Sequence, residues 1–401
     1  MNGPAPMFDG AAVKQRRRRQ FDELMTRHDL ATIVISSSEF FQFYANLAIS
    51  TFYWERPFAL VVSRQGAAFA IVNAVAENGV RMQLEKGIPW IDDFAFYCEV
   101  PQVRSGAPLT AEFAKALAAA MTERGLDRGR IGYDARTGVT TSLTAALPGT
   151  TLHDVANDLK ELRWVKHESE IRVMQMAADL GGWAMQTMRG ELRPGRLLQE
   201  LDQTVGARLM EEAARRVSGH NFLIAKIITL SGPASASTDG DGAPTGAVVQ
   251  ADVPTVSTIV TRLNGYSVEV HRTFWIGRPP PSQEAMLQAA LRMNEAAIGQ
   301  AFAGNRLSAI DEQAVKAARA AGVEHYVTHR AGHGIGTATH EYPEDLPVNR
   351  RTIERGEVLS LEPALYVAGL GGFRFGDAVV AEATPHVLTT APKSMADVIL
   401  R

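Results

Sequence analysis

Two β-rich stretches in the second half of the chain, residues 253–276 and 358–380, constrain its fold most. Each has the pattern of a long hairpin whose second arm starts with glycine and an aromatic residue, Gly265-Tyr266 in one and Gly372-Phe373 in the other. A helical pattern precedes each stretch. Because a helix-plus-hairpin unit that occurs twice indicates an internal pseudo-twofold, we expect a cleft between the two halves.

The first part of the chain alternates short apolar runs with helical patterns. Residues 31–36, 58–63 and 130–134 have the length and composition of strands, and the alanine-rich residues 111–120 indicate a helix. Alternating strands and helices predict an α/β layer. At roughly 100–200 residues per domain, the 401 residues predict two domains. We expect an α/β domain over residues 1–155 and an α+β domain over residues 156–401.

Composition narrows the class of function. The formal net charge of −3 leaves no broad basic field for nucleic acid. We interpret the arginine run at 16–19 as the solvated face of an amphipathic helix. Cys98 is the only cysteine, which excludes an internal disulfide and favours a cytoplasmic compartment. No apolar run approaches the roughly 18–20 residues of a membrane span.

Two histidines and a glutamate carry the sharpest chemical signal. His333 has glycine on both sides, which removes steric cover and lets the imidazole face a ligand, and His340 follows shortly after. Glu362 stands in the apolar run Leu359-Ser360-Leu361-Glu362-Pro363, where an ionised carboxylate is costly to bury unless it is paired or ligated. The alternative for Glu362 is an edge-strand carboxylate that faces water.

A third signal comes from alternation along residues 265–273. Side chains of a strand point alternately to its two faces, so Glu269 and His271 share one face and Val268 and Val270 share the other. We expect the polar face to line the cleft; the alternative is a solvated outer face.

Four motifs then occur in a fixed order. They are Gly265-Tyr266 with Arg272-Thr273, Gly332-His333-Gly334-Ile335-Gly336, His340-Glu341-x-Pro343, and Leu361-Glu362-Pro363. In this order they resemble the pita-bread family (the peptidase M24 superfamily), which includes methionine aminopeptidase, prolidase, aminopeptidase P and creatinase. The resemblance covers residues 157–401 strongly. Residues 1–155 resemble, more weakly, the domain that the longer members add.

The resemblance also bears on metals. The metal-dependent members hold two ions with Asp, Asp, His, Glu and Glu, and these ligands fall here at Thr258, Glu269, His333, Glu362 and Gly376. Two ligands are therefore lost and one is a methylene longer. The resemblance implies that Glu269, His333 and Glu362 hold at most one Mn, Fe, Co or Zn ion. The favoured expectation is no cofactor at all.

Creatinase, the metal-free precedent in that family, implies residues that bind substrate. Arg56, matched to an arginine of creatinase, would reach the site of a neighbouring subunit in a homodimer, and Trp54 would pack on the ligand. Asp239 and Asp241 stand where creatinase has its main histidine. The remaining expected substrate-binding residues are Tyr266, His271 and Asp377.

We therefore predict a metal-independent hydrolase that cleaves an amide, amidine or guanidino C–N bond in a small polar metabolite. His333 is the expected general acid or base, because the ordinary histidine pKa of about 6.5 lies near working pH. Glu269 and Glu362 would bind the cationic part of the substrate, and His271, together with His340, would polarise the scissile carbonyl or amidine. The alternatives are a mononuclear metal-dependent hydrolase or Xaa-Pro peptidase, a lyase on a betaine-like substrate, and a non-catalytic binding protein.

Overall fold

A computed structural model describes residues 8–49, 55–64, 66–98, 109–135, 137–237 and 242–401. The described chain divides into an N-terminal unit, Asp9–Leu162, and a C-terminal unit, Arg163–Arg401, to which Phe8 also belongs. The division falls a few residues after the boundary expected near residue 155.

The N-terminal unit is built on a six-stranded mixed sheet with the order β4-β3-β2-β1-β5-β6. Alternate residues of β1 enter different cores: Ile33 and Ile35 belong to one buried cluster and Val34 to another, so both faces of the sheet are covered. The strands are β1 (Thr32–Ile35), β2 (Ala59–Ser63), β3 (Ala68–Asn73), β4 (Asp93–Tyr97), β5 (Gly129–Tyr133) and β6 (Thr150–Asp154). The helices are α1 (Gly10–Arg27), α2 (Ser38–Ala45), α3 (Glu77–Glu85), α5 (Leu109–Glu123), α6 (Gly138–Ala146), α7 (Ala156–Trp164) and the 3₁₀ turn η1 (Ala74–Ala76).

The arginine run at 16–19 lies within α1, but its interpretation as a solvated face is wrong for one member. Arg17 is buried and stacks its guanidinium 4.1 Å from the centre of the Phe43 ring. At 3.6 residues per turn, four consecutive side chains cover most of the circumference of a helix. One arginine of such a run therefore has to face the core.

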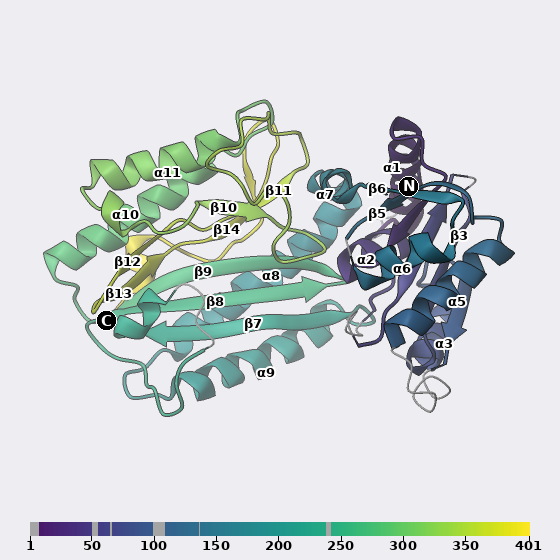
Figure 1. Cartoon of the computed structure of the whole chain (residues 1–401). Helices are drawn as coiled ribbons and strands as arrows, with labels where there is room; N and C mark the ends of the chain where they lie inside the picture. Colours follow the sequence, from purple (N-terminus) through teal and green to yellow (C-terminus); the bar gives the residue numbers. More distant parts are fainter. Residues whose placement is uncertain (1–7, 50–54, 65, 99–108, 136, 238–241) are drawn as a thin grey trace, which may run out of the picture. The chain divides into compact units, whose positions relative to one another are not determined.

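The C-terminal unit contains the first of the two expected repeats. The long antiparallel strands β7 (Phe222–Ser231), β8 (Pro254–Leu263) and β9 (Tyr266–Ile276) form a sheet that the short β16 (Ile399–Leu400) extends beside β9. The helices α8 (Glu168–Glu191) and α9 (Leu198–Arg216) pack along one face of this sheet (Figure 1). Val268 and Val270 of β9 point into that helix-covered core.

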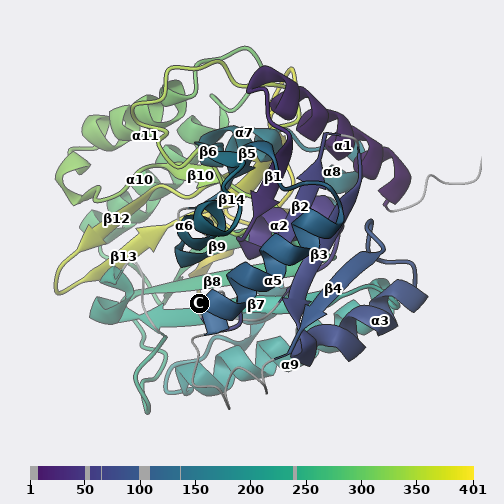
Figure 2. The same cartoon turned by 45° about the vertical axis from the view of Figure 1, so that its right-hand side comes forward.

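The second repeat follows with the same order of elements. Helices α10 (Pro281–Ile298) and α11 (Ser308–Ala320) pack together, and α10 contacts β11, β12 and β13 (Figure 2). One sheet has the order β10-β11-β14-β15, and β12 pairs with β13. The remaining elements are β10 (Gly332–Gly334), β11 (Val358–Leu361), β12 (Ala364–Val367), β13 (Gly371–Arg374), β14 (Asp377–Val380), β15 (His386–Val387), α12 (Met395–Val398), η2 (Gly232–Ala236) and η3 (Glu324–Tyr326).

The apolar periodicity of residues 157–188 predicts one helix, but the structure has two there, α7 and α8. The chain leaves the helical path between them because Val165 bridges to Glu357, and the backbone N–H of Lys166 donates to the carbonyl of Gly356. His167 then caps α8 by accepting from the N–H of Ser169. The apolar periodicity continues across the break, so the pattern alone could not reveal it.

Within the described residues, every helix is either too short or too polar to cross a membrane.

Candidate active site

A cavity of about 520 Å³ lies on the face of the β7–β8–β9 sheet that points away from α8. The orientation of the strands follows from Thr261, whose hydroxyl donates to the carbonyl of Ala177 in α8, which marks the helix-facing side chains of β8. Thr258, Val260, Glu269 and His271 have the opposite orientation and line the cavity. The expected polar face of residues 265–273 therefore faces a cavity and not bulk water.

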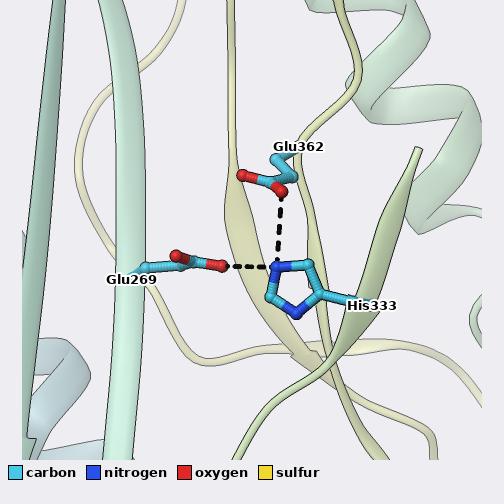
Figure 3. Close-up of side chains that lie close together, drawn as sticks. All are labelled: Glu269, His333 and Glu362. Atoms are coloured by element: carbon cyan, nitrogen blue, oxygen red, sulfur yellow. Dashed lines mark ion pairs between the residues drawn. The ribbon is translucent and has the colours of Figure 1, made fainter. Parts of the chain in front are cut away.

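Three of the predicted residues lie close together (Figure 3), and two of them, Glu269 and Glu362, line this cavity. Glu269 comes from the middle of β9, His333 from β10, and Glu362 from the position directly after β11. Nε2 of His333 lies 3.1 Å from Oε1 of Glu269 and 3.3 Å from Oε1 of Glu362. One ligand atom from each of the three residues lies within 4.8 Å of the others.

Burial and neighbouring charges shift the pKa values of this cluster in opposite directions. Burial alone would lower the pKa of His333, but the two facing carboxylates outweigh it and raise this pKa to about 10. Burial would raise the pKa of Glu362, and the neighbouring Arg374 and His271 instead hold it well below its ordinary value. Glu362 therefore stands ionised beside cationic groups, which is the arrangement in which buried charge is tolerated.

The ring of His271 fills the space that a side chain at residue 376 would need. A Cβ atom added to Gly376 would lie 2.2 Å from Cδ2 of the His271 ring, so no side chain fits at residue 376 while His271 holds this position. The two backbones are fixed against each other by reciprocal hydrogen bonds of 3.1 and 3.0 Å. Gly376 and the histidine on the facing strand thus form one steric unit.

The imidazole of His271 also links Thr258 to the two carboxylates. Nδ1 of His271 is hydrogen-bonded to the hydroxyl of Thr258 at 2.9 Å. Nε2 of His271 lies 3.1 Å from Oε2 of Glu362 and 3.7 Å from Oε2 of Glu269. Arg374 pairs with the same oxygen of Glu362 and lines the cavity, so this arginine is part of the site itself.

The glycines beside His333 serve packing more than exposure. A Cβ atom at Gly332 would lie 2.1 Å from the carbonyl oxygen of Ser360, and one at Gly334 would lie 2.4 Å from that of Tyr342. His333 itself is buried. The missing side chains let β10 approach its neighbours closely enough for the imidazole to reach Glu362.

His340 lies against His333 at the wall of the cavity. Their rings stack with 3.8 Å between centroids and an interplanar angle of 15°. Burial and the nearby His333 lower the pKa of His340, which keeps its imidazole neutral. The loop that carries it is anchored by Glu341, whose buried carboxylate accepts hydrogen bonds from Arg163 and, at 3.0 Å, from Lys166.

Two residues expected to bind substrate have other roles. Asp377 is fully buried, pairs with Arg272 at 2.8 Å and Lys393 at 2.7 Å, and is not part of the cavity wall. Tyr266 donates its hydroxyl to Glu170 at 2.7 Å and is likewise outside that wall. The prediction that Asp377 and Tyr266 bind substrate is therefore wrong. Asp377 follows Gly376 directly, and a step of one residue along a strand turns the side chain to the other face.

The remaining predicted residues lie elsewhere in the chain. Arg56 belongs to the N-terminal unit, where its guanidinium lies 3.0 Å from the carboxylate of Glu55. Its role toward a neighbouring subunit, and the homodimer that this role requires, stay predictions. Trp54, Asp239 and Asp241 lie outside the described residues.

Several side chains of the cavity wall were not predicted from the sequence. Nε2 of His329 lies 3.1 Å from the hydroxyl of Tyr366, and both residues line the cavity together with Arg330 and Lys226. His329 comes four residues before His333, and Tyr366 four residues after Glu362. The sequence feature that could have indicated His329 and Tyr366 is this spacing of four residues from His333 and from Glu362.

Known proteins resemble this chain in sequence and in fold. A relative from Bacillus subtilis, YkvY, is 29% identical over 63% of this chain and 68% of its own length. The Xaa-Pro dipeptidase of Pyrococcus furiosus is 25% identical over 55% of this chain and 62% of its own length. The solved X-Pro aminopeptidase of Thermotoga maritima superposes with a TM-score of 0.79 at 19% identity, covering 96% of this chain and 99% of that one.

Two family models match the chain in the expected order. The creatinase/prolidase N-terminal domain matches residues 17–165, and metallopeptidase family M24 matches residues 172–383, more than half of the chain. The predicted two-domain fold, an N-terminal α/β domain followed by a pita-bread domain, is confirmed. The chain belongs to metallopeptidase family M24.

Proposed function

We propose that this protein hydrolyses the C–N bond of a small peptide with the help of one divalent metal ion held by Glu269, His333 and Glu362. The observation that carries the proposal is the convergence of three ligand atoms within 4.8 Å beside the cavity. The similarity to Xaa-Pro dipeptidase supports a dipeptide as substrate. The proposal therefore takes the metal-dependent alternative and not the metal-free hydrolase that the sequence favoured.

The donor set suits one ion. Imidazole nitrogen and carboxylate oxygens are ligands that Zn, Fe, Co and Mn accept. Oε1 of Glu269 and Nε2 of His333 are buried, yet neither forms a well-aligned hydrogen bond among the described residues. Buried polar atoms left in this state are expected where an ion completes the site.

A second ion does not fit the same residues. Thr258 and Gly376 offer no carboxylate where the family has an aspartate and a glutamate. The ring of His271 lies where a side chain at residue 376 would project. A second cation would also stand next to Arg374, which already pairs with Glu362, and like charges at close range repel.

Each side chain of the site then has a specific task. A bound ion would polarise the scissile carbonyl and lower the pKa of a water molecule. Arg374 and His271 hold the carboxylate of Glu362 in a fixed orientation through their contacts with its Oε2 atom. His340, neutral and on the cavity wall, can hydrogen-bond a substrate carbonyl. The hydroxyl of Tyr366, held by His329, offers a second polar contact.

Metal content and hydrolysis test the proposal together. Purified protein should contain or bind one ion of Mn, Fe, Co or Zn per chain, measured by elemental analysis and calorimetry. It should hydrolyse Xaa-Pro dipeptides in a chelator-sensitive way. Glu362→Ala should lose both properties, while Glu324→Ala, which changes an exposed glutamate of the same unit, should keep them. Two tightly bound ions per chain would contradict the one-metal centre.

One observation favours a second candidate, the metal-free C–N hydrolase. Nε2 of His271 lies 3.1 Å from Glu362, and Arg374 pairs with the same carboxylate, so protein cations already balance part of the negative charge. Hydrolysis of creatine, ectoine or a dipeptide that survives complete removal of metal would establish this candidate in place of the first.

A further inference from the structure

The edge strand β7 contains an irregularity beside the cavity. Ile224 pairs with Thr261 of β8, but Lys226 pairs with Val260, so Ala225 is an extra residue without a partner in the ladder. Such a bulge shifts all later side chains of the strand by one position relative to the partner strand. It therefore decides which face Lys226 occupies.

The bulge brings Lys226 to the cavity face. Before the bulge, Ile224 is opposite Thr261, whose side chain points to α8. With regular pairing, Lys226 would stand opposite Ile259, which is completely buried in the helix-covered core. Because of the extra residue it stands opposite Val260 instead and lines the cavity.

Lys226 lies in one row with the catalytic cluster. Val260 pairs with Lys226 on one side and with Glu269 on the other. At about 4.8 Å between neighbouring strands, the backbones of Lys226 and Glu269 are about 10 Å apart. The row thus presents an ammonium group at the edge of the sheet, an apolar residue between, and the carboxylate–histidine cluster at the inner end.

The charge of Lys226 is available to a ligand. The residue is exposed, and within the described part of the chain no acidic side chain forms an ion pair with it. The other cations of the wall are held by the protein itself: Arg374 pairs with Glu362, and Arg330 is tethered by a 3.1 Å hydrogen bond from its Nε atom to the carbonyl of Gly332. A long cationic side chain placed over an apolar neighbour suits an anionic group at the end of an apolar ligand.

We propose that Lys226 binds the C-terminal carboxylate of the substrate, and so selects short peptides with a free carboxylate over their amides. This inference rests on the proposed function, because it assigns one end of the same substrate. The scissile bond lies at Glu269, His333 and Glu362, and the apolar side chain next to the carboxylate lies over Val260.

Steady-state kinetics with Ala-Pro and its C-terminal amide test this role. Replacing Lys226 by methionine, an unbranched and uncharged side chain one atom shorter, should raise KM for Ala-Pro about tenfold or more, since hydrogen bonds to charged groups contribute about 1.5–3 kcal/mol. It should change kcat little and affect the amide much less. Lys226→Arg should restore most of the affinity. Lys316→Met, an exposed lysine of α11, is the matched control.

Binding measurements separate this inference from the proposed function. If the wild type cleaves no peptide, the proposed function fails, but calorimetry should still show preferential binding of Ala-Pro over its amide, lost in Lys226→Met. Equal effects of Lys226→Met on both ligands, no preference in the wild type, or no binding of either ligand would overturn the role of Lys226. A loss of preference in Arg330→Met with none in Lys226→Met would do the same.

Discussion

A methyl group at residue 376 should be tolerated only when His271 is removed. In the wild type, the Cβ atom of Gly376→Ala would lie 2.2 Å from Cδ2 and 2.9 Å from Cγ of His271. The ring cannot simply rotate away, because Nδ1 is bound to Thr258 and Nε2 lies against Glu362. The added atom therefore has to displace a buried ring or the two paired backbones.

The magnitude follows from two opposing effects. Overpacking a buried site costs about 1–3 kcal/mol. The backbone at Gly376 is not in the left-handed region, so replacing glycine by alanine also stabilises the fold by about 0.4–1 kcal/mol through the unfolded chain. Gly376→Ala should therefore lower the free energy of unfolding by about 1–2 kcal/mol. In a His271→Ala background, where only the Cβ atom of residue 271 remains, at 3.1 Å, the same change should be neutral or stabilising.

Urea unfolding of the four proteins in this cycle measures the coupling directly. We expect an interaction energy of about 1–3 kcal/mol between residues 271 and 376, in the range found for residues in contact. Additive effects, with Gly376→Ala equally destabilising in both backgrounds, would refute the steric unit and with it the argument against a second metal ion.

Three further outcomes are expected. Burial would raise the pKa of Asp377, but its cationic partners outweigh burial and lower this pKa to about 2. The contribution of Asp377 to the free energy of unfolding, about 2 kcal/mol, is therefore complete above the unfolded-state pKa near 4 and lost as pH falls through 2. Urea unfolding should show a weaker acid dependence for Asp377→Asn. Glu341→Gln leaves Arg163 and Lys166 buried without their carboxylate, so the free energy of unfolding should fall by about 3–5 kcal/mol, and a loss below 1 kcal/mol would contradict the network. Glu362→Gln should weaken metal binding at least about 100-fold by calorimetry, and unchanged affinity would remove Glu362 from the ligand set.

The sequence predicted most of the site because the decisive patterns are local. Alternation along one strand placed Glu269 and His271 on a common face, and His333 and Glu362 stood out by their immediate neighbours. The same local logic failed for Asp377 and Tyr266. Their partners, Arg272 and Glu170, could not be identified from spacing along the chain.

The sequence by itself determined the family and the order of the two repeats, and it put residues without a carboxylate at Thr258 and Gly376. Only the tertiary structure showed that His271 occupies the space of the missing side chain at Gly376, and that the bulge at Ala225 turns Lys226 into the cavity. Residues 271 and 376 are far apart in sequence and meet only when β9 packs against the second repeat. A strand's face is encoded by a period of two residues, whereas a contact between distant strands depends on how whole layers pack.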